Sequence, residues 1–254
     1  MRTPAEKLEP AVRDPRKLRM TALILTTLMV ISGVGVYIAY LKLSERQADV
    51  ETPSFKGRIE KNFKVWRQDE SEGDFASMEG EVFVIAPVLF SEPERWAHTR
   101  GVLERLSQRY ADRKDFHIVC LTIDPENEPP KKLAEYAKDL GATLPQWWLA
   151  AAREESVHKF LKNTLKMETI PYRKDGKWDY DGTLVVIDRD RHIRKGTVKM
   201  SARSRSDAKF DFEAAAKWGE KHPTDGDKER VSRDLENLLV NVIDHVLAQP
   251  VTKQ

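Results

Sequence analysis

The chain has 254 residues, a length that suits one membrane anchor and one soluble domain. Its 43 Lys and Arg residues nearly balance 41 Asp and Glu residues, which leaves a net charge of +2. This balance argues against a nucleic-acid-binding protein, which would carry a basic excess on one face. The chain has a single cysteine, Cys120, which excludes an intrachain disulfide, a C-x-x-C redox motif and a cysteine-rich zinc site.

The first expected element is a transmembrane helix over Met20–Tyr40. This segment contains no charged residue, and a helix of its length spans roughly 30 Å, about the hydrocarbon thickness of a bilayer. The alternatives are a buried core helix and a cleavable signal peptide. The apolar part of a signal peptide is shorter and ends at a small-x-small site, whereas this segment ends in the sequence YIAYLK. We therefore expect an uncleaved anchor.

The charges that flank the anchor predict its orientation. Residues 1–19 are rich in basic residues, whereas the segment after the anchor mixes basic and acidic ones. By the positive-inside bias, residues 1–19 form a cytoplasmic tail and the rest of the chain lies outside. The sequence thus predicts a single-pass protein of the cell inner membrane with its domain in the periplasm. The charges concerned are Arg2, Lys7, Arg13, Arg16, Lys17 and Arg19 before the anchor, and Lys42, Glu45, Arg46, Asp49 and Glu51 after it.

The segment after the anchor changes from polar to strongly apolar. Residues 41–60 are polar and aperiodic and predict a tether, and the folded domain is expected over residues 61–250. Phe63–Trp66 alternates and predicts a first strand. Glu81–Phe90 is a continuous apolar run of strand length, which is typical of a strand buried on both faces. A Ser-Glu-Pro-Glu start then predicts a helix over residues 91–110.

The remaining elements alternate between strands and helices. We expect a second buried strand, two helices, a strand hairpin about a charged turn, and a last amphipathic helix with apolar residues at i, i+4, i+7, i+8, i+11 and i+15. Residues 201–229 are charged and weakly patterned and predict a surface insertion. The expected ranges are Phe116–Ile123 (strand), Leu133–Leu140 with Gly141 as its stop and Glu154–Leu165 (helices), Thr183–Ile187 and His192–Val198 (hairpin), and Val231–Val246 (last helix).

This order predicts the fold class. A β-α-β start followed by an antiparallel hairpin gives an α/β domain with a mixed sheet and flanking helices. The layout is thioredoxin-like, and one N-terminal transmembrane helix precedes it.

Several strings in the domain resemble the Sco/SenC family, in the same order along the chain. The resemblance covers about residues 60–200 and implies a thioredoxin-like domain behind a membrane anchor. Sco proteins bind copper through a C-x-x-x-C motif and a distant histidine, and they assist copper delivery to cytochrome oxidase or act as thiol reductants in that pathway. The matching strings are Ser77–Val82, Thr122–Glu126 (TIDPE) followed by Leu133–Ala137, Trp148–Leu149 followed by Ala152–Glu155, and Leu184–Asp188 (LVVID).

The chain departs from the family at the metal ligands. Val88 and Glu92 fall at the positions of the two cysteines, and Tyr180 falls at the position of the histidine. Copper(I) prefers thiolate and imidazole donors, whereas Val88 supplies no donor and the other two supply oxygens. Thiol exchange needs a second sulfur. We therefore expect no copper, no other cofactor and no enzymatic activity.

Three other residues are weak candidates for a relocated metal site. Cys120 could be a reactive or metal-binding thiol, but a cysteine in a buried strand is more often an inert hydrophobe. His98 lies on the helix beside the degenerate motif and could approach the old site, or it could be a surface histidine. Asp179 could join Asp181 and Glu92 in binding a hard cation, or it could lie on a solvated rim.

These expectations lead to two hypotheses about function. The first is a non-catalytic binding or assembly factor for a respiratory, cytochrome-oxidase-type membrane complex, which interacts with the membrane through Met20–Tyr40 and with a protein of that complex, and not with nucleic acid. The alternative is a metal-binding or redox protein with a relocated site, built from Cys120 and a histidine or from the carboxylates around Glu92 and Asp179. The missing C-x-x-x-C motif favours the first hypothesis.

Overall fold

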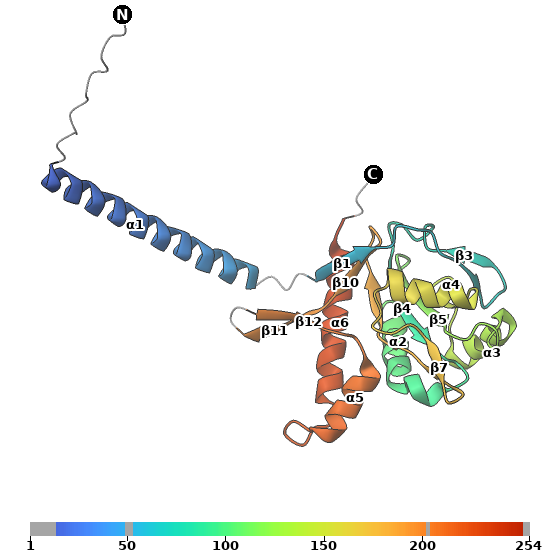
Figure 1. The fold of residues 1–254 in the computed structure, drawn as a ribbon. Coiled ribbons are helices and arrows are strands. Elements are labelled where there is room, and N and C mark those ends of the chain that lie inside the picture. The colour runs from blue at the N-terminus through green and yellow to red at the C-terminus, as the bar shows by residue number, and fades with distance from the viewer. Residues whose placement is uncertain (1–13, 49–52, 202–203, 251–254) are drawn as a thin grey trace, which may run out of the picture. The chain divides into compact units, whose positions relative to one another are not determined.

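The computed structural model describes residues 14–48, 53–201 and 204–250. The chain divides into two compact units, Met1–Glu51 and Thr52–Gln254. Figure 1 shows the helices and strands of each unit.

The first unit contains one long helix, α1 (Pro15–Ala48). It begins with a proline, which suits the first turn, and the Asp14 carboxylate accepts the Arg16 N–H at 2.9 Å. The stretch Pro15–Ile38 has a mean hydropathy of 2.0, and by length and composition it could cross a membrane. It covers most of the span expected from the sequence.

The hydroxyl groups within this apolar stretch are satisfied inside the helix. Thr21, Thr26, Thr27 and Ser32 each donate a hydrogen bond to a carbonyl oxygen three or four residues earlier, at 2.8–2.9 Å. A polar group left without a partner costs several kcal/mol in hydrocarbon. These bonds make the hydroxyls compatible with an apolar environment.

The second unit is built on an eight-stranded sheet with the order β1-β10-β9-β4-β5-β6-β2-β3. Strands β4, β5 and β6 are parallel, and the other neighbours in the sheet are antiparallel. The strands are β1 (Ser54–Arg58), β2 (Lys64–Arg67), β3 (Glu72–Asp74), β4 (Val82–Val88), β5 (Phe116–Thr122), β6 (Trp147–Ala151), β9 (Val185–Ile187) and β10 (His192–Lys195).

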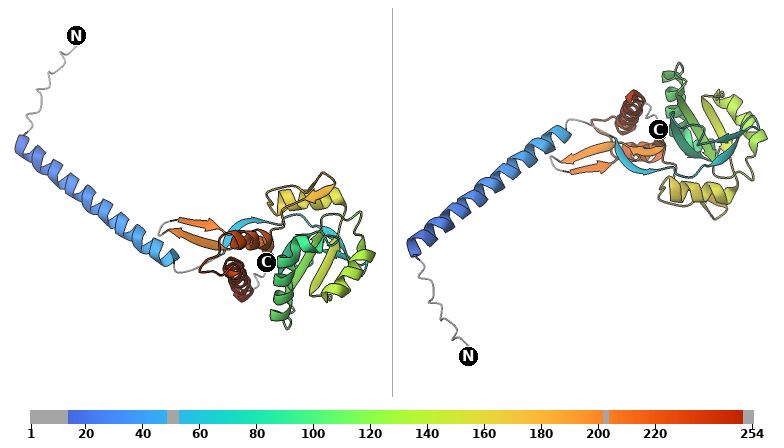
Figure 2. Two further views of the ribbon diagram at one scale, coloured as in Figure 1. Left: turned by 90° about the horizontal axis from the view of Figure 1, so that it is seen from below. Right: turned by 90° about the horizontal axis from the view of Figure 1, so that it is seen from above.

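Helices cover both faces of this sheet, and two small hairpins lie outside it. Figures 1 and 2 show α4 on one side of the sheet and α2 and α6 on the other. The helical segments are η1 (Pro93–Trp96), α2 (Ala97–Arg109), α3 (Pro130–Leu140), α4 (Glu154–Lys159), η2 (Phe160–Thr164), α5 (Phe212–Lys221) and α6 (Arg230–Ala248). The hairpins are β7 (Tyr172–Lys174) with β8 (Lys177–Asp179) and β11 (Thr197–Ser201) with β12 (Ser204–Asp207).

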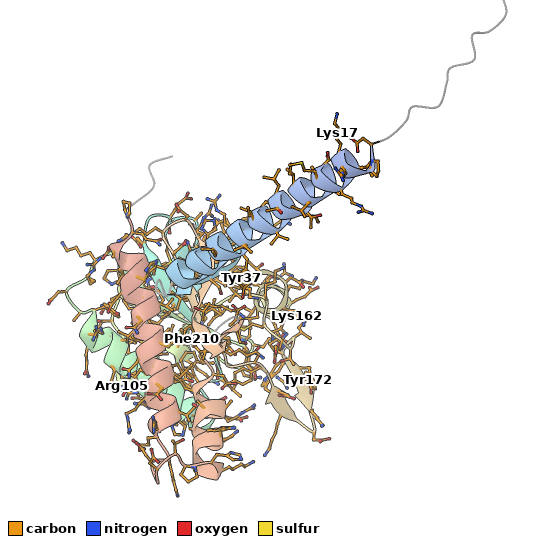
Figure 3. All side chains as sticks on the ribbon, turned by 90° about the vertical axis from the view of Figure 1, so that its left-hand side faces the viewer. Lys17, Tyr37, Arg105, Lys162, Tyr172 and Phe210 are labelled. Atoms are coloured by element: carbon orange, nitrogen blue, oxygen red, sulfur yellow. The ribbon has the colours of Figure 1, made fainter. Side chains whose placement is uncertain are left out.

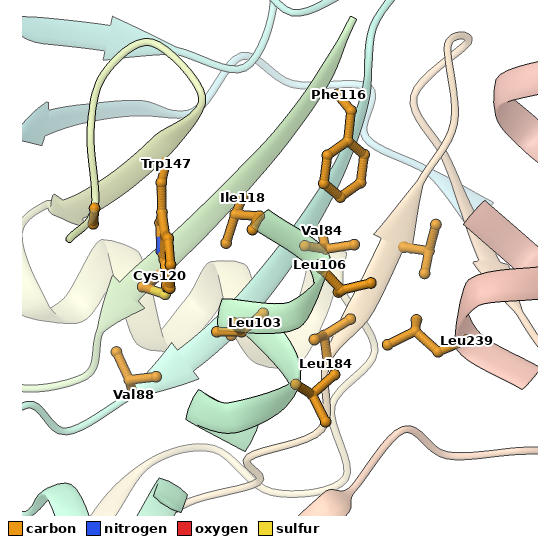
Figure 4. Packing of buried hydrophobic residues seen from close by; sticks show 14 of the residues in the cluster. Val84, Val88, Leu103, Leu106, Phe116, Ile118, Cys120, Trp147, Leu184 and Leu239 are labelled. Carbon is orange, nitrogen blue, oxygen red and sulfur yellow. The ribbon is translucent and has the colours of Figure 1, made fainter. Parts of the chain in front are cut away.

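The central strands divide their side chains between two apolar layers. In β4, Val84 and Val88 join the cluster formed with α2, α3 and α6, whereas Phe83 and Ile85 join the cluster formed with α4 and η2. This two-residue period is what a strand buried on both faces requires. Figure 4 shows the first layer, in which Leu103 and Leu106 of α2 pack over the sheet.

Two segments contain helices or strands that the sequence did not predict, because most of their residues are polar. The expected tether over residues 41–60 contains the end of α1, which runs to Ala48, and strand β1, which pairs with β10. The expected surface insertion over residues 201–229 contains α5. Phe210 and Phe212 are buried in the core there, so this segment belongs to the domain (Figure 3).

The predicted element order also missed strand β6. Its sequence is WWLAA, and all five residues are buried between β5 and β2. The short β7–β8 hairpin was missed as well. The predicted order is therefore wrong in these details, whereas the α/β class with a mixed sheet and flanking helices is confirmed.

Candidate functional site

The degenerate ligand positions lie around the loop that follows β4. Val88 is the last residue of β4, and Glu92 immediately precedes η1. Tyr180 directly follows β8, and its phenol oxygen interacts with the backbone of Leu89 in the same loop. The structure thus brings the segments that carry these positions together.

Val88 belongs to the apolar core. Its side chain is fully buried in the same cluster as Cys120, and Figure 4 shows both residues in this layer. A valine at this position fills the core and offers no atom that can coordinate a metal. The first of the three positions is therefore occupied by a packing residue.

Arg95 links the other two positions. Its Nη1 lies 3.3 Å from Glu92 Oε2, and its guanidinium lies 5.0 Å from the centre of the Tyr180 ring. The same nitrogen donates a hydrogen bond to the carbonyl oxygen of Trp178 in β8. Arg95 therefore balances the charge of Glu92, stacks on Tyr180 and ties η1 to β8.

Tyr180 is held as a neutral phenol at physiological pH. Its removal from water raises the pKa of the phenol to about 12, although the nearby charge of Arg95 acts in the opposite direction. A neutral phenol is a hard oxygen group and a poor substitute for imidazole as a copper(I) ligand. The donor set in this region therefore does not fit copper(I), and the guanidinium of Arg95 would repel a cation.

The buried carboxylate of Glu128 also fixes the loop after β4. Glu128 lies in the connection between β5 and α3 and is 1% exposed. Its Oε1 accepts the Ser91 N–H at 2.7 Å, and its Oε2 accepts the hydroxyl of Thr122. The connection after β5 thus fixes the loop after β4. Sequence reasoning missed Glu128, because its only signal was an acidic residue shortly after a buried strand.

Asp124 fixes the β7–β8 hairpin in a similar way. Its carboxylate accepts hydrogen bonds from Trp178 Nε1 at 2.8 Å and from Asn127 Nδ2 at 3.0 Å, and Arg173 Nη2 lies 3.3 Å away. The ring of His158 contacts the Trp178 ring edge-on, with centroids 5.2 Å apart. These contacts tether β8, and with it Tyr180, to the end of β5.

Cys120 is inaccessible. It is fully buried in β5, and the Trp147 indole N–H donates to its sulfur at 3.3 Å. Burial raises the pKa of the thiol to about 12. Because the thiolate is the form that binds metals and attacks disulfides, this environment favours the inert interpretation. Figure 4 shows Cys120 beside Trp147 within the core.

The other weak candidates do not gather around the site. His98 is exposed and lines a different cavity, between α2, α5 and α6. Asp179 accepts the hydroxyl of Tyr172 at 2.7 Å, and Asp181 accepts the Glu168 N–H at 2.7 Å. Within the part of the chain that the structure describes, no three His, Cys, Asp or Glu residues are grouped so that they could hold a metal ion.

Comparisons with known proteins point to one family. No protein-family model matches the chain. A stretch of 110 residues is 26% identical to the SCO1 protein homolog of Bacillus subtilis strain 168, covering 41% of this chain and 55% of that protein. The match therefore spans about half the length of that relative.

The similarity to solved structures concerns the fold. A SCO1/SenC family lipoprotein from Bacillus anthracis strain Ames has a TM-score of 0.51 at 15% identity, covering 75% of this chain and 99% of that one. Copper-bound ScoI of Bradyrhizobium japonicum has a TM-score of 0.43 at 14% identity, covering 70% and 98%. The first of these matches confirms the thioredoxin-like domain that the sequence predicts.

Proposed function

We propose that this chain is a Sco/SenC-related, membrane-anchored, non-catalytic binding or assembly factor for a respiratory complex of the cytochrome oxidase type. In this proposal the protein shares the fold of the family and acts in the same pathway, but it carries out no metal chemistry. Its membrane attachment is supported by the apolar stretch Pro15–Ile38 of α1.

The proposal rests on the site after β4, where other side chains occupy the positions of the metal ligands. Where the family places two thiolates and an imidazole, this chain places Val88, the Glu92–Arg95 ion pair and the neutral phenol of Tyr180. Glu128 and Arg95 hold this arrangement from two sides through hydrogen bonds. A scaffold that keeps its shape without metal ligands is suited to binding another protein.

We also propose the topology that the flanking charges predict. The N-terminal tail lies in the cytoplasm, α1 spans the inner membrane, and the domain lies in the periplasm. A reporter enzyme that is active only after export, fused behind Gln254, should be active in intact cells. The same reporter fused in the N-terminal tail before Pro15 should be inactive, and the reverse pattern would contradict this topology.

Copper loading tests the non-catalytic role. The full-length protein in detergent is incubated with copper(I), dialysed and measured by elemental analysis. We expect much less than one equivalent of copper to be retained. The matched control is the triple variant Val88→Cys, Glu92→Cys, Tyr180→His, which restores the donor set and should retain more copper than the wild type. One equivalent on the wild-type chain would contradict the proposal.

The assembly role needs a separate measurement. Deleting the gene should lower the amount of assembled terminal oxidase in the membrane, and the wild-type chain should restore it. If metal transfer is not the function, the wild-type chain should restore the oxidase without the three ligand substitutions. Normal oxidase levels in the deletion strain would contradict the assembly role.

The alternative of a relocated site has little structural support. Cys120 would need to become a thiolate, but burial raises the pKa of its thiol to about 12. His98 lies in another cavity, and Glu92 and Asp179 have separate partners. If Cys120→Ser and His98→Ala abolished a metal affinity of the wild-type chain, this alternative would replace the proposal.

A further inference from the structure

We propose that Arg95 is the internal ligand of a guanidinium site formed by Glu92, the Trp178 carbonyl and the Tyr180 ring, and that it closes the β7–β8 hairpin against the loop after β4. The hairpin is then a strap that opens when the guanidinium leaves this site. The strap controls the conformation of the site discussed above, so its biological meaning rests on the proposed function. The contacts that form it can be tested separately.

The β7–β8 hairpin lies outside the main sheet. It forms a two-stranded sheet of its own. All three residues of β7 are exposed, and in β8 only Trp178 is buried. A two-stranded hairpin is marginally stable at best in water. The position of this hairpin therefore depends on the contacts that it makes with the rest of the domain.

Trp178 is held both by its indole and by its main chain. The indole N–H donates to Asp124 Oδ2 at 2.8 Å, and the carbonyl oxygen accepts a hydrogen bond from Arg95 Nη1. Asp124 lies in the connection after β5 and also pairs with Arg173 of β7 at 3.3 Å, whereas Arg95 lies in η1. The hairpin is thus held on one side by a carboxylate and on the other by a guanidinium.

The Arg95 guanidinium meets three kinds of group that bind such a cation. Glu92 supplies a carboxylate oxygen at 3.3 Å, and Trp178 supplies a carbonyl oxygen. Tyr180 supplies an aromatic ring whose centre lies 5.0 Å away. A guanidinium is planar and delocalised, so it can donate hydrogen bonds and also stack on a ring. One side chain therefore joins the loop after β4 to the end of β8.

The guanidinium is in contact with water, so it can leave its site. The side chains of Arg95 and Glu92 are 31% and 32% exposed, and Arg95 lines a cavity of about 420 Å³. Solvent and salt weaken an ion pair of this kind. When Arg95 leaves, Trp178 loses one of its two attachments. Opening of the hairpin should therefore be more frequent than unfolding of the main sheet.

Exchange of the Trp178 indole proton tests the strap. The full-length protein in phosphatidylcholine nanodiscs is transferred to deuterated water, and the indole ¹H–¹⁵N signals of the six tryptophans are followed. Trp178→Phe identifies the signal of Trp178. Because Asp124 accepts this proton in the closed state, exchange requires opening. We expect Arg95→Ala to raise the exchange rate about tenfold, as expected for the loss of a hydrogen bond from a charged donor.

Arg100→Ala is the matched control. Arg100 pairs with Glu104 within α2, at 2.8 Å and with a similar exposure of 37%. Its removal should leave the exchange of the Trp178 indole proton unchanged. Arg95→Lys keeps the charge but lacks the planar fork, so it should protect this proton less than the wild type and more than Arg95→Ala.

A guanidinium supplied from solution should restore the closed state. Ethylguanidinium, at a concentration far below that which unfolds proteins, should slow the exchange of Trp178 in Arg95→Ala towards the wild-type rate. Sodium chloride at the same ionic strength should not. An absence of any response to ethylguanidinium would overturn the guanidinium site.

The outcomes separate the strap from the proposed function. An unchanged exchange rate in Arg95→Ala would overturn the strap, and so would an equal acceleration of the amide protons of β4 and β5, because Arg95 would then stabilise the whole domain. Neither result would affect the copper and oxidase experiments. Normal oxidase levels in the deletion strain would overturn the proposed function, whereas faster exchange confined to the hairpin and reversed by ethylguanidinium would still support the strap.

Discussion

The carboxylate of Glu128 accepts the main-chain N–H of Ser91 at 2.7 Å, and this bond joins the connection after β5 to the loop after β4. The two connections leave the sheet at the same edge because β4 and β5 are parallel. Glu128 is buried, and its other oxygen accepts the hydroxyl of Thr122. The Glu128 side chain therefore fixes the backbone of the loop that contains Glu92.

Replacing Glu128 should destabilise the domain. Glu128→Ala leaves the Ser91 N–H and the Thr122 hydroxyl without their acceptor, and we expect a loss of about 2–4 kcal/mol in the free energy of unfolding. Glu128→Gln has the same shape and keeps one acceptor oxygen, so its loss should be about half as large. Urea unfolding followed by tryptophan fluorescence measures both. Equal stability of the wild type and the alanine variant would show that the bond to Ser91 contributes nothing.

The thiol of Cys120 should be unreactive in the native protein. Because its pKa is raised to about 12 and its side chain is fully buried, the native chain should not react with a thiol reagent such as DTNB at pH 8. The same chain in urea should release one equivalent of thionitrobenzoate. Rapid reaction without urea would show that Cys120 is accessible, and it would revive the redox alternative.

Much of the fold could be predicted because the signals were local. The β4 and β5 strands are uninterrupted apolar runs, and α6 shows a clear helical period. Strand β6 was missed because WWLAA is short and does not alternate between polar and apolar residues. Strand β1 was missed because it lies at one edge of the sheet and its sequence, SFKGR, is mostly polar.

The site could be predicted only in outline. The sequence identified Val88, Glu92 and Tyr180 as departures from a ligand pattern, because a missing cysteine or histidine is visible in the sequence. It did not identify what replaces the metal ligands. The bonds of Arg95 to β8 and of Glu128 to Ser91 join residues far apart in the chain, and only the folded arrangement of parallel strands brings them together.

The phenol of Tyr180 should contribute to the alkaline sensitivity of the domain. Its pKa is about 12 in the folded chain and 10.0 for the free side chain, so folding raises it. The stability that this difference contributes is complete below about pH 10 and is lost as the pH rises towards 12. Tyr180→Phe removes the titrating group, and we expect about 1–2 kcal/mol less loss of stability over that window.

The measurement is the free energy of unfolding at a series of pH values between 8 and about 11.5 for the wild type and the variant. Tyr172→Phe is the control, because Tyr172 lies exposed on the β7–β8 hairpin, where Figure 3 labels it. It should flatten the alkaline slope less than Tyr180→Phe does. Parallel curves for the wild type and Tyr180→Phe would show that the phenol is not shielded from water.

Two glycine-to-alanine changes in helices should have opposite effects. An alanine Cβ at position 219 in α5 would lie 2.1 Å from the carbonyl oxygen of Lys228, so the backbone leading into α6 would have to move. The expected cost, about 2–4 kcal/mol, exceeds the gain of about 1 kcal/mol that alanine normally gives in a helix.

At position 101 in α2, the added Cβ meets only the end of the Arg105 side chain, at 3.3 Å. Gly101→Ala should therefore stabilise the domain by up to about 1 kcal/mol. Thermal unfolding of both variants tests this pair, and a stabilised Gly219→Ala variant would show that α5 and the Lys228 backbone are not in close contact.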